Sequence, residues 1–234
     1  MIRYSLDGGT ARITLSRTDP GNKLTLQMVY DLITALEKAN ASGAAYLVID
    51  SDQPDFTAGR DQGEKVALPR RENLSLILKA NKLLRNFPGI SVALIRGQAL
   101  GFGAGIAAHS TIAIAEDTAT FGFDEINHNL APLIVIAYLP HFIGAKAARE
   151  LCLTGRRIDA AEALRLGLVN SIVPQGGLNA AFEDLRTRTE GLHRGALKLI
   201  RSFSERSTPY PSDELLAGAV DELAAWIDAG RPVD

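Results

Sequence analysis

The sequence predicts an α/β fold with a largely parallel sheet, and two observations lead to this prediction. The apolar runs Tyr46–Asp50 and Ile90–Ile95 contain no breaker and are typical of buried strands. Each run is followed by a loop that carries glycine and then by a segment with helical spacing. Because strand, loop and helix recur in this order, we expect parallel strands joined by right-handed crossovers.

The N-terminal elements are predicted from turn and cap signals. Ile2–Leu6 and Ala11–Leu15 are expected to be strands, since the segment Asp7-Gly-Gly-Thr10 between them is typical of a hairpin turn. Thr25 is a suitable N-cap for a helix that extends to about Ala41 and has one apolar face.

The middle of the chain contains a charged segment and a second long helix. Gly63–Glu72 includes Pro69 and is expected to be a mobile loop over the ligand site. Apolar spacing predicts a helix over Asn73–Phe87, which Pro88-Gly89 ends.

The C-terminal part is predicted to be helical. Asp159 and Gly167 delimit a short helix, and Pro174–Gly177 is the best boundary in the chain. Two amphipathic helices are expected beyond it, and Pro209-Tyr-Pro211 separates the second from a last helix that begins at Ser212.

The composition argues against several classes of function. The 234 residues carry a formal net charge of −2, which gives no basic field for nucleic acid. No apolar run is long enough to span a membrane, and the first residues lack the apolar core of a signal peptide. Cys152 is the sole cysteine, so we expect it to be buried packing in a reducing compartment, the cytoplasm. The four histidines lack metal-ligand spacing, so no metal is expected.

The most informative segment is the glycine-dense stretch Gly97–Gly105, which follows a predicted strand and precedes a helix. Glycine permits close approach of a ligand, and a helix N-terminus presents unpaired N–H donors. The spacing matches neither a dinucleotide-binding nor a Walker A loop, which leaves close helix packing as the competing explanation. A similar loop, Asp55–Asp61, follows the Tyr46–Asp50 strand. One N–H from each loop would form an oxyanion hole.

These two loops resemble those of a known family. Phe56-Thr-Ala-Gly-Arg-Asp61 and Gly97-Gln-Ala-Leu-Gly-Phe-Gly103 are similar to the two oxyanion loops of the crotonase (enoyl-CoA hydratase/isomerase) superfamily. Further segments resemble the family in its own order: Ile112–Phe121, Phe121–Glu125, and Leu153–Ile158 with Ala160–Val169. No single motif is decisive, but the resemblance covers roughly residues 1–175.

The resemblance implies a crotonase-type ββα spiral core over residues 1–175, followed by a C-terminal helical trimerisation region over residues 176–234. It also implies a homotrimer or hexamer.

The implied activity is that of an enoyl-CoA hydratase or isomerase, a lyase or isomerase of the kind found in fatty acid metabolism. The partner would be an acyl-CoA thioester, with coenzyme A as part of the substrate and no cofactor. The backbone N–H groups of Arg60 and Phe102 would stabilise the oxygen of a thioester enolate, and Glu125 would be the single acid/base.

Other site residues carry over from the same motifs. The residues expected to bind coenzyme A or the acyl group are Arg17, Ala58, Gly59, Asp61, Gln62, Gly101 and Gly103. His128 would assist if Glu125 begins a helical turn. One departure is that Gly105 stands where many hydratases of the family have a second glutamate. The apolar stretch Leu130–Tyr138 is expected to be a helix that would wall a pocket for a bulky or cyclic acyl group.

Two alternatives remain open on the sequence. One is a hydrolase of the same fold that cleaves a carbon–carbon bond in a diketone without coenzyme A. The other is a non-catalytic member that binds acyl-CoA or a protein partner, which the departure at Gly105 makes credible.

Overall fold

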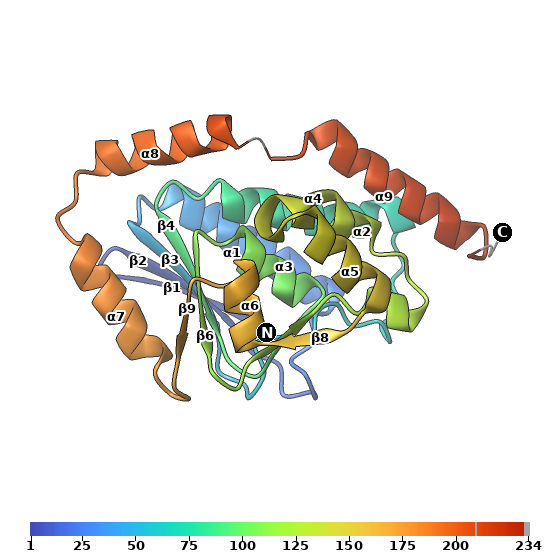
Figure 1. Ribbon diagram of the computed structural model, residues 1–234, viewed down its shortest axis with the longest axis horizontal. Helices are drawn as coiled ribbons and strands as arrows, with labels where there is room; N and C mark the ends of the chain where they lie inside the picture. Colours follow the sequence, from blue (N-terminus) through green and yellow to red (C-terminus); the bar gives the residue numbers. More distant parts are fainter. Residues whose placement is uncertain (209, 232–234) are drawn as a thin grey trace.

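The computed structural model describes residues 1–208 and 210–231 and shows a twisted sheet with helices on both faces (Figure 1). The strands are β1 (Ile2–Asp7), β2 (Thr10–Leu15), β3 (Tyr46–Ser51), β4 (Ile90–Ile95), β5 (Gln98–Leu100), β6 (Ile112–Glu116), β7 (Thr120–Gly122), β8 (Arg157–Asp159) and β9 (Ser171–Val173). The helices are α1 (Leu26–Ala41), α2 (Arg70–Arg85), α3 (Phe102–His109), the 3₁₀ helix η1 (Glu125–His128), α4 (Leu133–Ile143), α5 (Ala145–Thr154), α6 (Ala160–Leu166), α7 (Leu178–Thr189), α8 (Arg194–Ser207) and α9 (Asp213–Asp228).

The larger sheet confirms the predicted parallel arrangement. Its order is β1-β2-β3-β4-β6-β9, and only the β1–β2 hairpin is antiparallel. A smaller sheet, β5-β7-β8, lies at the end of the larger one where the glycine loops begin. The segment 112–121 is divided between β6 and β7 and thus contributes to both sheets.

Side chains on the central strands alternate between two apolar layers, as the pleat of a strand requires. On β3, Leu47 and Ile49 face the main core, which includes residues of α1, α3, α4 and α9. Tyr46 and Val48 face a smaller core on the other side, where Leu178 and other residues of α7 cover the sheet (Figure 1). Because both faces of β3 are buried, the sequence of this strand is apolar at consecutive positions and does not alternate with polar residues.

Helix starts agree with prediction where a polar side chain caps the first turn. Thr25 caps α1 by accepting from the Met28 N–H, as expected. The predicted starts of α2 and α4 are wrong. The first begins at Arg70, directly after the N-cap Pro69, because the arginines of its first turn pair with acidic residues of α9. The second begins at Leu133, since the left-handed conformation of Asn129 interrupts the chain before Pro132.

The C-terminal helices take three different positions (Figure 1). α7 covers the outer face of the sheet, α8 lies at the periphery, and α9 packs against α2 and α4 through Leu216, Val220 and Leu223. Ser212 caps α9, as predicted, whereas the predicted break at Pro209 lies outside the described residues. Among the helices of the described part, none has the length and apolar character needed to cross a bilayer.

Candidate active site at the N-terminus of α3

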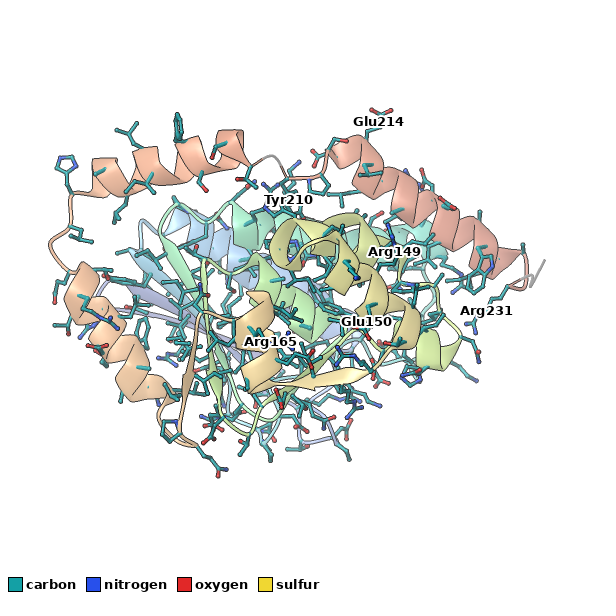
Figure 2. The ribbon with its side chains drawn as sticks, viewed as in Figure 1. Arg149, Glu150, Arg165, Tyr210, Glu214 and Arg231 are labelled. Carbon is teal, nitrogen blue, oxygen red and sulfur yellow. The ribbon has the colours of Figure 1, made fainter. Side chains whose placement is uncertain are left out.

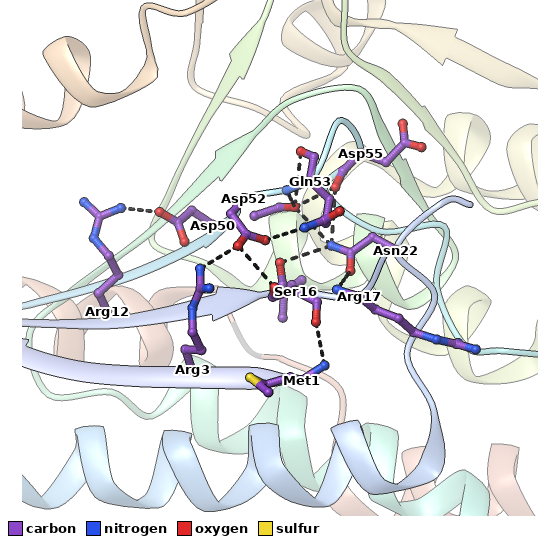
Figure 3. A network of polar contacts seen from close by, with 12 residues as sticks. Met1, Arg3, Arg12, Ser16, Arg17, Asn22, Asp50, Asp52, Gln53 and Asp55 are labelled. Carbon is purple, nitrogen blue, oxygen red and sulfur yellow. Dashed lines mark hydrogen bonds and ion pairs between the residues drawn. The ribbon is translucent and has the colours of Figure 1, made fainter. Parts of the chain in front are cut away.

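The first glycine loop, residues 55–61, is held in place by Asn22 (Figure 3). This residue is 1% exposed and adopts a left-handed backbone with φ 47°. Its side-chain amide donates to Ser51 Oγ (3.0 Å) and to the Phe56 carbonyl (2.8 Å), and its backbone carbonyl accepts from Thr57 Oγ1 (2.8 Å). Asn22 therefore ties the end of β3 to the loop, a role that the sequence did not reveal.

The two glycine loops are joined by main-chain contacts. The Thr57 N–H donates to the Gln98 carbonyl (2.9 Å), and the Leu100 N–H donates to the Thr57 carbonyl (2.9 Å). A Cβ on Gly103 would lie 2.6 Å from that same Thr57 oxygen, and a Cβ on Gly59 would lie 2.8 Å from the Leu100 oxygen. Real Cβ atoms essentially never approach so closely, so both positions require glycine.

Two main-chain donors are left beside this junction. The Leu24 N–H donates to the Gly59 carbonyl and the Asp61 N–H donates to the Leu24 carbonyl, so the N–H of Arg60, between them, points to the other side. Phe102 is the first residue of α3, where an N–H has no partner within the helix. A Cβ on Gly59 would lie 3.4 Å from the Phe102 nitrogen, which places the two loops in contact at this point. The predicted donor residues are thus brought together.

Glu125 lies beside the same helix terminus. It begins η1, and one carboxylate oxygen, Oε1, is 3.0 Å from the position of a Cβ on Gly101. The other oxygen, Oε2, is buried and has no hydrogen-bond partner among the described residues. Burial raises the pKa of Glu125 from 4.5 to about 7, and the nearby Asp124 adds to the rise. A buried carboxyl group of this kind exchanges protons readily near neutral pH.

Tyr138 lies beside α3, and His109 is the last residue of this helix. Tyr138 ends the apolar stretch that was expected to wall a pocket, whereas no role was predicted for His109. Tyr138 of α4 is 2% exposed, and its hydroxyl lies 2.9 Å from the position of a Cβ on Gly105. Two contacts fix the His109 ring: Nδ1 lies 2.7 Å from the Gly105 carbonyl, and Nε2 lies 2.6 Å from the Tyr210 hydroxyl. Tyr210 lies in the segment that precedes α9 (Figure 2). The carbonyl only accepts, so Nδ1 carries the proton and Nε2 accepts from Tyr210. Burial lowers the pKa of His109 to about 4, which keeps it neutral.

The other residues predicted to bind coenzyme A or the acyl group lie in or beside the first glycine loop, residues 55–61. Arg17 donates to Asp61 Oδ2 (2.8 Å) and also pairs with Asp19, and Asp61 is the main cause that raises the pKa of Arg17. A phosphate that binds Arg17 must therefore share it with these carboxylates. Ala58 is half-buried next to Gly59, and Gln62 is exposed.

His128 takes part less directly than expected. Glu125 does begin a helical turn, the condition for which His128 was expected to assist. However, His128 is exposed, whereas Glu125 is half-buried and its Oε2 is fully buried. Within residues 1–208 and 210–231, no group of three or more His, Cys, Asp or Glu side chains is placed to hold a metal ion.

The side chain of Arg60 connects the site to a hollow at the start of α2. Its guanidinium donates to the Leu24 carbonyl (2.9 Å) and to Asn73 Oδ1 (3.2 Å). Asn73 also lines a hollow of about 410 Å³ together with Leu68 and Pro69. The Arg60 side chain is 11% exposed, and burial lowers its pKa, so it serves as a structural brace while its backbone N–H remains available.

Comparison with known sequences gives consistent matches over most of the chain. The family model of enoyl-CoA hydratase/isomerase matches residues 6–208. A putative enoyl-CoA hydratase of Thermus thermophilus is 31% identical over 229 residues, which cover 95% of this chain and 88% of the relative. The mitochondrial enoyl-CoA hydratase domain-containing protein 3 of Rattus norvegicus is 27% identical over 86% of this chain and 69% of its own length.

Solved structures agree in fold. An enoyl-CoA hydratase from Mycobacterium avium subsp. paratuberculosis superposes with a TM-score of 0.88 at 23% identity and covers 97% of this chain and 93% of its own. An enoyl-CoA hydratase/isomerase from Xanthobacter autotrophicus Py2 has a TM-score of 0.84 at 24% identity, with 96% and 86% covered. The expected crotonase fold is confirmed.

Proposed function

Since the chain belongs to the enoyl-CoA hydratase/isomerase family, we propose that it is an enzyme that moves a proton at the acyl chain of an acyl-CoA thioester through an enolate. The observation that carries this proposal is the Glu125 carboxyl group beside the N-terminus of α3, whose buried Oε2 has no partner in the described part of the chain. A buried ionisable group without a partner costs stability, and such groups concentrate at sites of chemistry.

The backbone donors supply the electrostatic part of the reaction. The thioester oxygen would accept hydrogen bonds from the N–H groups of Arg60 and Phe102 and would carry the enolate charge at the positive end of α3. Loss of one such donor typically costs about 3 kcal/mol of barrier. Both donors belong to the main chain, and the Arg60 side chain braces the first of them through the Leu24 carbonyl and Asn73.

Glu125 supplies the proton transfer. A pKa of about 7 gives substantial populations of both the carboxylate, which abstracts a proton, and the acid, which returns it. Hydration and double-bond isomerisation share this enolate and this acid/base. Coenzyme A takes part as a portion of the substrate, and no cofactor is required.

The acyl group and the coenzyme A moiety are assigned to the two sides of the first loop. Arg17, Asp61 and Gln62 lie at its mouth and would meet the coenzyme A, while Ala58 and Gly59 would line it with main chain. The apolar residues of α4 would wall the acyl group, which favours a bulky or cyclic one. An acyl-CoA complex in which the acyl chain lies far from α4 would contradict this assignment.

Oligomer formation is part of the same proposal. α8 exposes Ile200 (67%), and Leu192 before it is 48% exposed. Burial of such side chains between subunits would stabilise a homotrimer or hexamer. Light scattering would show either a trimer or hexamer mass, as we expect, or a monomer, which would contradict it.

The test of function uses mass spectrometry of saturated, 2-enoyl and 3-enoyl coenzyme A thioesters incubated with the protein in heavy water. We expect deuterium uptake at the α-carbon, water addition or double-bond migration. Glu125→Gln should abolish the signal because it removes the proton carrier and keeps the shape. Glu222→Gln, on the exposed face of α9, is the matched control and should behave as the wild type.

Two other outcomes would redirect the assignment. Turnover of a diketone without coenzyme A would favour the carbon–carbon bond hydrolase. Binding of acyl-CoA without deuterium uptake from any thioester would favour a non-catalytic role.

A further inference from the structure

The Tyr138 hydroxyl and the Glu125 carboxyl group both approach the beginning of α3. Glu125 Oε1 is 3.0 Å from the Cβ position of Gly101, and the Tyr138 hydroxyl is 2.9 Å from that of Gly105. Gly101 is the N-cap of α3, and its carbonyl accepts from the Gly105 N–H at 3.0 Å, so the two glycines stand at the two ends of the first turn. The two polar groups therefore meet this turn at positions that carry no side chain. Besides burial, the charge of Glu125 contributes to the raised pKa of Tyr138, which agrees with their proximity.

Both groups have hydrogen-bonding capacity that the described residues leave unused. Glu125 Oε2 is buried without a partner among these residues, and the Tyr138 hydroxyl, which is not fully buried, makes no hydrogen bond to them. Buried hydroxyl and carboxyl oxygens normally have hydrogen-bond partners. Two such groups that face one helical turn indicate that a small polar molecule, a water or a substrate oxygen, completes both.

The phenol is neutral at working pH. Burial is the main cause that raises the pKa of Tyr138 well above 10, and the charge of Glu125 adds to it. A neutral phenol both donates and accepts a hydrogen bond. The ring is fixed by its edge-to-face contact with His109, at 4.6 Å between centroids. His109 is in turn held by the Gly105 carbonyl and the Tyr210 hydroxyl.

We propose that Tyr138 and Glu125 together hold the water that adds to the β-carbon of a 2-enoyl thioester, so that the reaction of this site is hydration. The inference rests on the proposed function and deepens it. Gly105 leaves room for the phenol, which provides the second hydrogen-bonding group that a single carboxyl group lacks.

In this step Glu125 transfers one proton from the water to the α-carbon. The water oxygen bonds to the β-carbon while Glu125 takes one of its protons, and the electron pair of the double bond moves toward the thioester oxygen, where the N–H groups of Arg60 and Phe102 stabilise it. Glu125 then gives that proton to the α-carbon. Tyr138 accepts a hydrogen bond from the proton that stays on the water oxygen and keeps its own proton throughout. The product is the 3-hydroxyacyl thioester.

The experiment compares hydration with α-proton exchange in the same variants. Exchange of the α-proton of a saturated acyl-CoA in heavy water needs Glu125 and the oxyanion donors but no held water. Tyr138→Phe should therefore lower kcat/KM for hydration about 10²-fold and change the exchange rate by less than about threefold. The matched control is Tyr46→Phe, a buried tyrosine on the other side of the sheet whose hydroxyl contacts Thr189 Oγ1 at 2.8 Å. It should leave both rates unchanged.

A second variant tests the same proposal in case Tyr138→Phe does not fold stably. Gly105→Ala places a Cβ within 2.9 Å of the hydroxyl and displaces it without removing the ring. Hydration should again fall while exchange persists. The proposal is wrong if hydration survives in Tyr138→Phe, if hydration and exchange fall together in folded protein, or if the wild type exchanges the α-proton and hydrates nothing. Absence of both reactions in the wild type would instead overturn the proposed function itself.

Discussion

Replacement of Glu125 by glutamine should change the pH dependence of folding stability in a predictable direction. The pKa of the carboxyl group is about 7 in the folded protein and 4.5 as its ordinary value. Between these values the folded state holds a proton that the unfolded chain has released. The free energy of unfolding therefore falls as the pH rises through this range, because the unfolded state binds fewer protons.

The magnitude follows from the two pKa values. Linkage over this shift makes the ionisation of Glu125 cost about 2.5 kcal/mol of stability between pH 5 and pH 8. Glutamine cannot ionise and has nearly the same shape. The unfolding free energy of Glu125→Gln minus that of the wild type should thus increase by about 2.5 kcal/mol from pH 5 to pH 8. Other titrating groups, including His109, contribute equally to both proteins and cancel.

Urea denaturation of both proteins at pH 5 and pH 8 measures this difference directly. Glu222→Gln serves as the control for removal of an exposed carboxyl group and should show no such increase. The same ionisation should appear in the α-proton exchange rate of the wild type, whose kcat/KM should rise with pH and level off above about pH 7. A stability difference that is constant between the two pH values would falsify the claim that Glu125 is buried as an acid, and with it the basis of its proposed role.

Three further predictions follow from the packing of the site. In Gly103→Ala the new Cβ would lie 2.6 Å from the Thr57 carbonyl oxygen, which must move away by about 0.8 Å. Because this shift displaces the first loop, kcat/KM should drop about 10²-fold. Gly218→Ala, whose Cβ meets open space in α9, is the control and should leave the kinetics unchanged. Asn22→Ala leaves buried carbonyls and hydroxyls without a donor and should lower the free energy of unfolding by about 2–3 kcal/mol in denaturant titration; a loss below 0.5 kcal/mol would show that water replaces the amide. His109 stays neutral in the fold until about pH 4, while the unfolded chain binds its proton below its ordinary pKa of 6.5, so stability falls as the pH falls through this range. Between pH 7 and pH 4, the free energy of unfolding of His109→Gln should therefore fall by about 3 kcal/mol less than that of the wild type. An equal fall in both proteins would contradict the claim that His109 is neutral in the folded state.

Elements with local signals were predictable from the sequence. The side chains of Thr25, Asp159 and Ser212 each accept a hydrogen bond from an N–H in the first turn of the helix that they cap. Gly167 ends α6 with a positive φ. Each of these boundaries is therefore defined by a few adjacent residues. The start of α2 at Arg70 was missed because its charged first turn resembles a loop. Its arginines instead pair with acidic residues of α9, which is far away in the sequence.

Of the candidate site, only the position of the backbone N–H groups could be predicted from local sequence signals. Glycine loops after two strands indicate where N–H groups converge, which requires no knowledge of distant side chains. Glu125 was assigned through the family resemblance alone, since an isolated glutamate in a turn is usually exposed. The positions of Tyr138 and Asn22 depend on contacts between segments far apart in the sequence. The available signals were the bare Gly105 and the Gly21-Asn22 turn, and neither specifies its partner.

Close packing and function were competing explanations for the glycines of α3. The structure shows close packing at Gly103, while the surroundings of Gly101 and Gly105 support the proposed site. Gly103 is required by packing, because the Thr57 carbonyl of the first loop occupies the space of its Cβ. Gly101 and Gly105 face the other side, where Glu125 and Tyr138 reach the helix surface. The tight contact on one side fixes the distance between the two loops, and the positions without side chains on the other side leave room for the groups that we propose to react. A side chain at Gly103 should therefore impair every reaction of the enolate, whereas one at Gly105 should impair water addition alone.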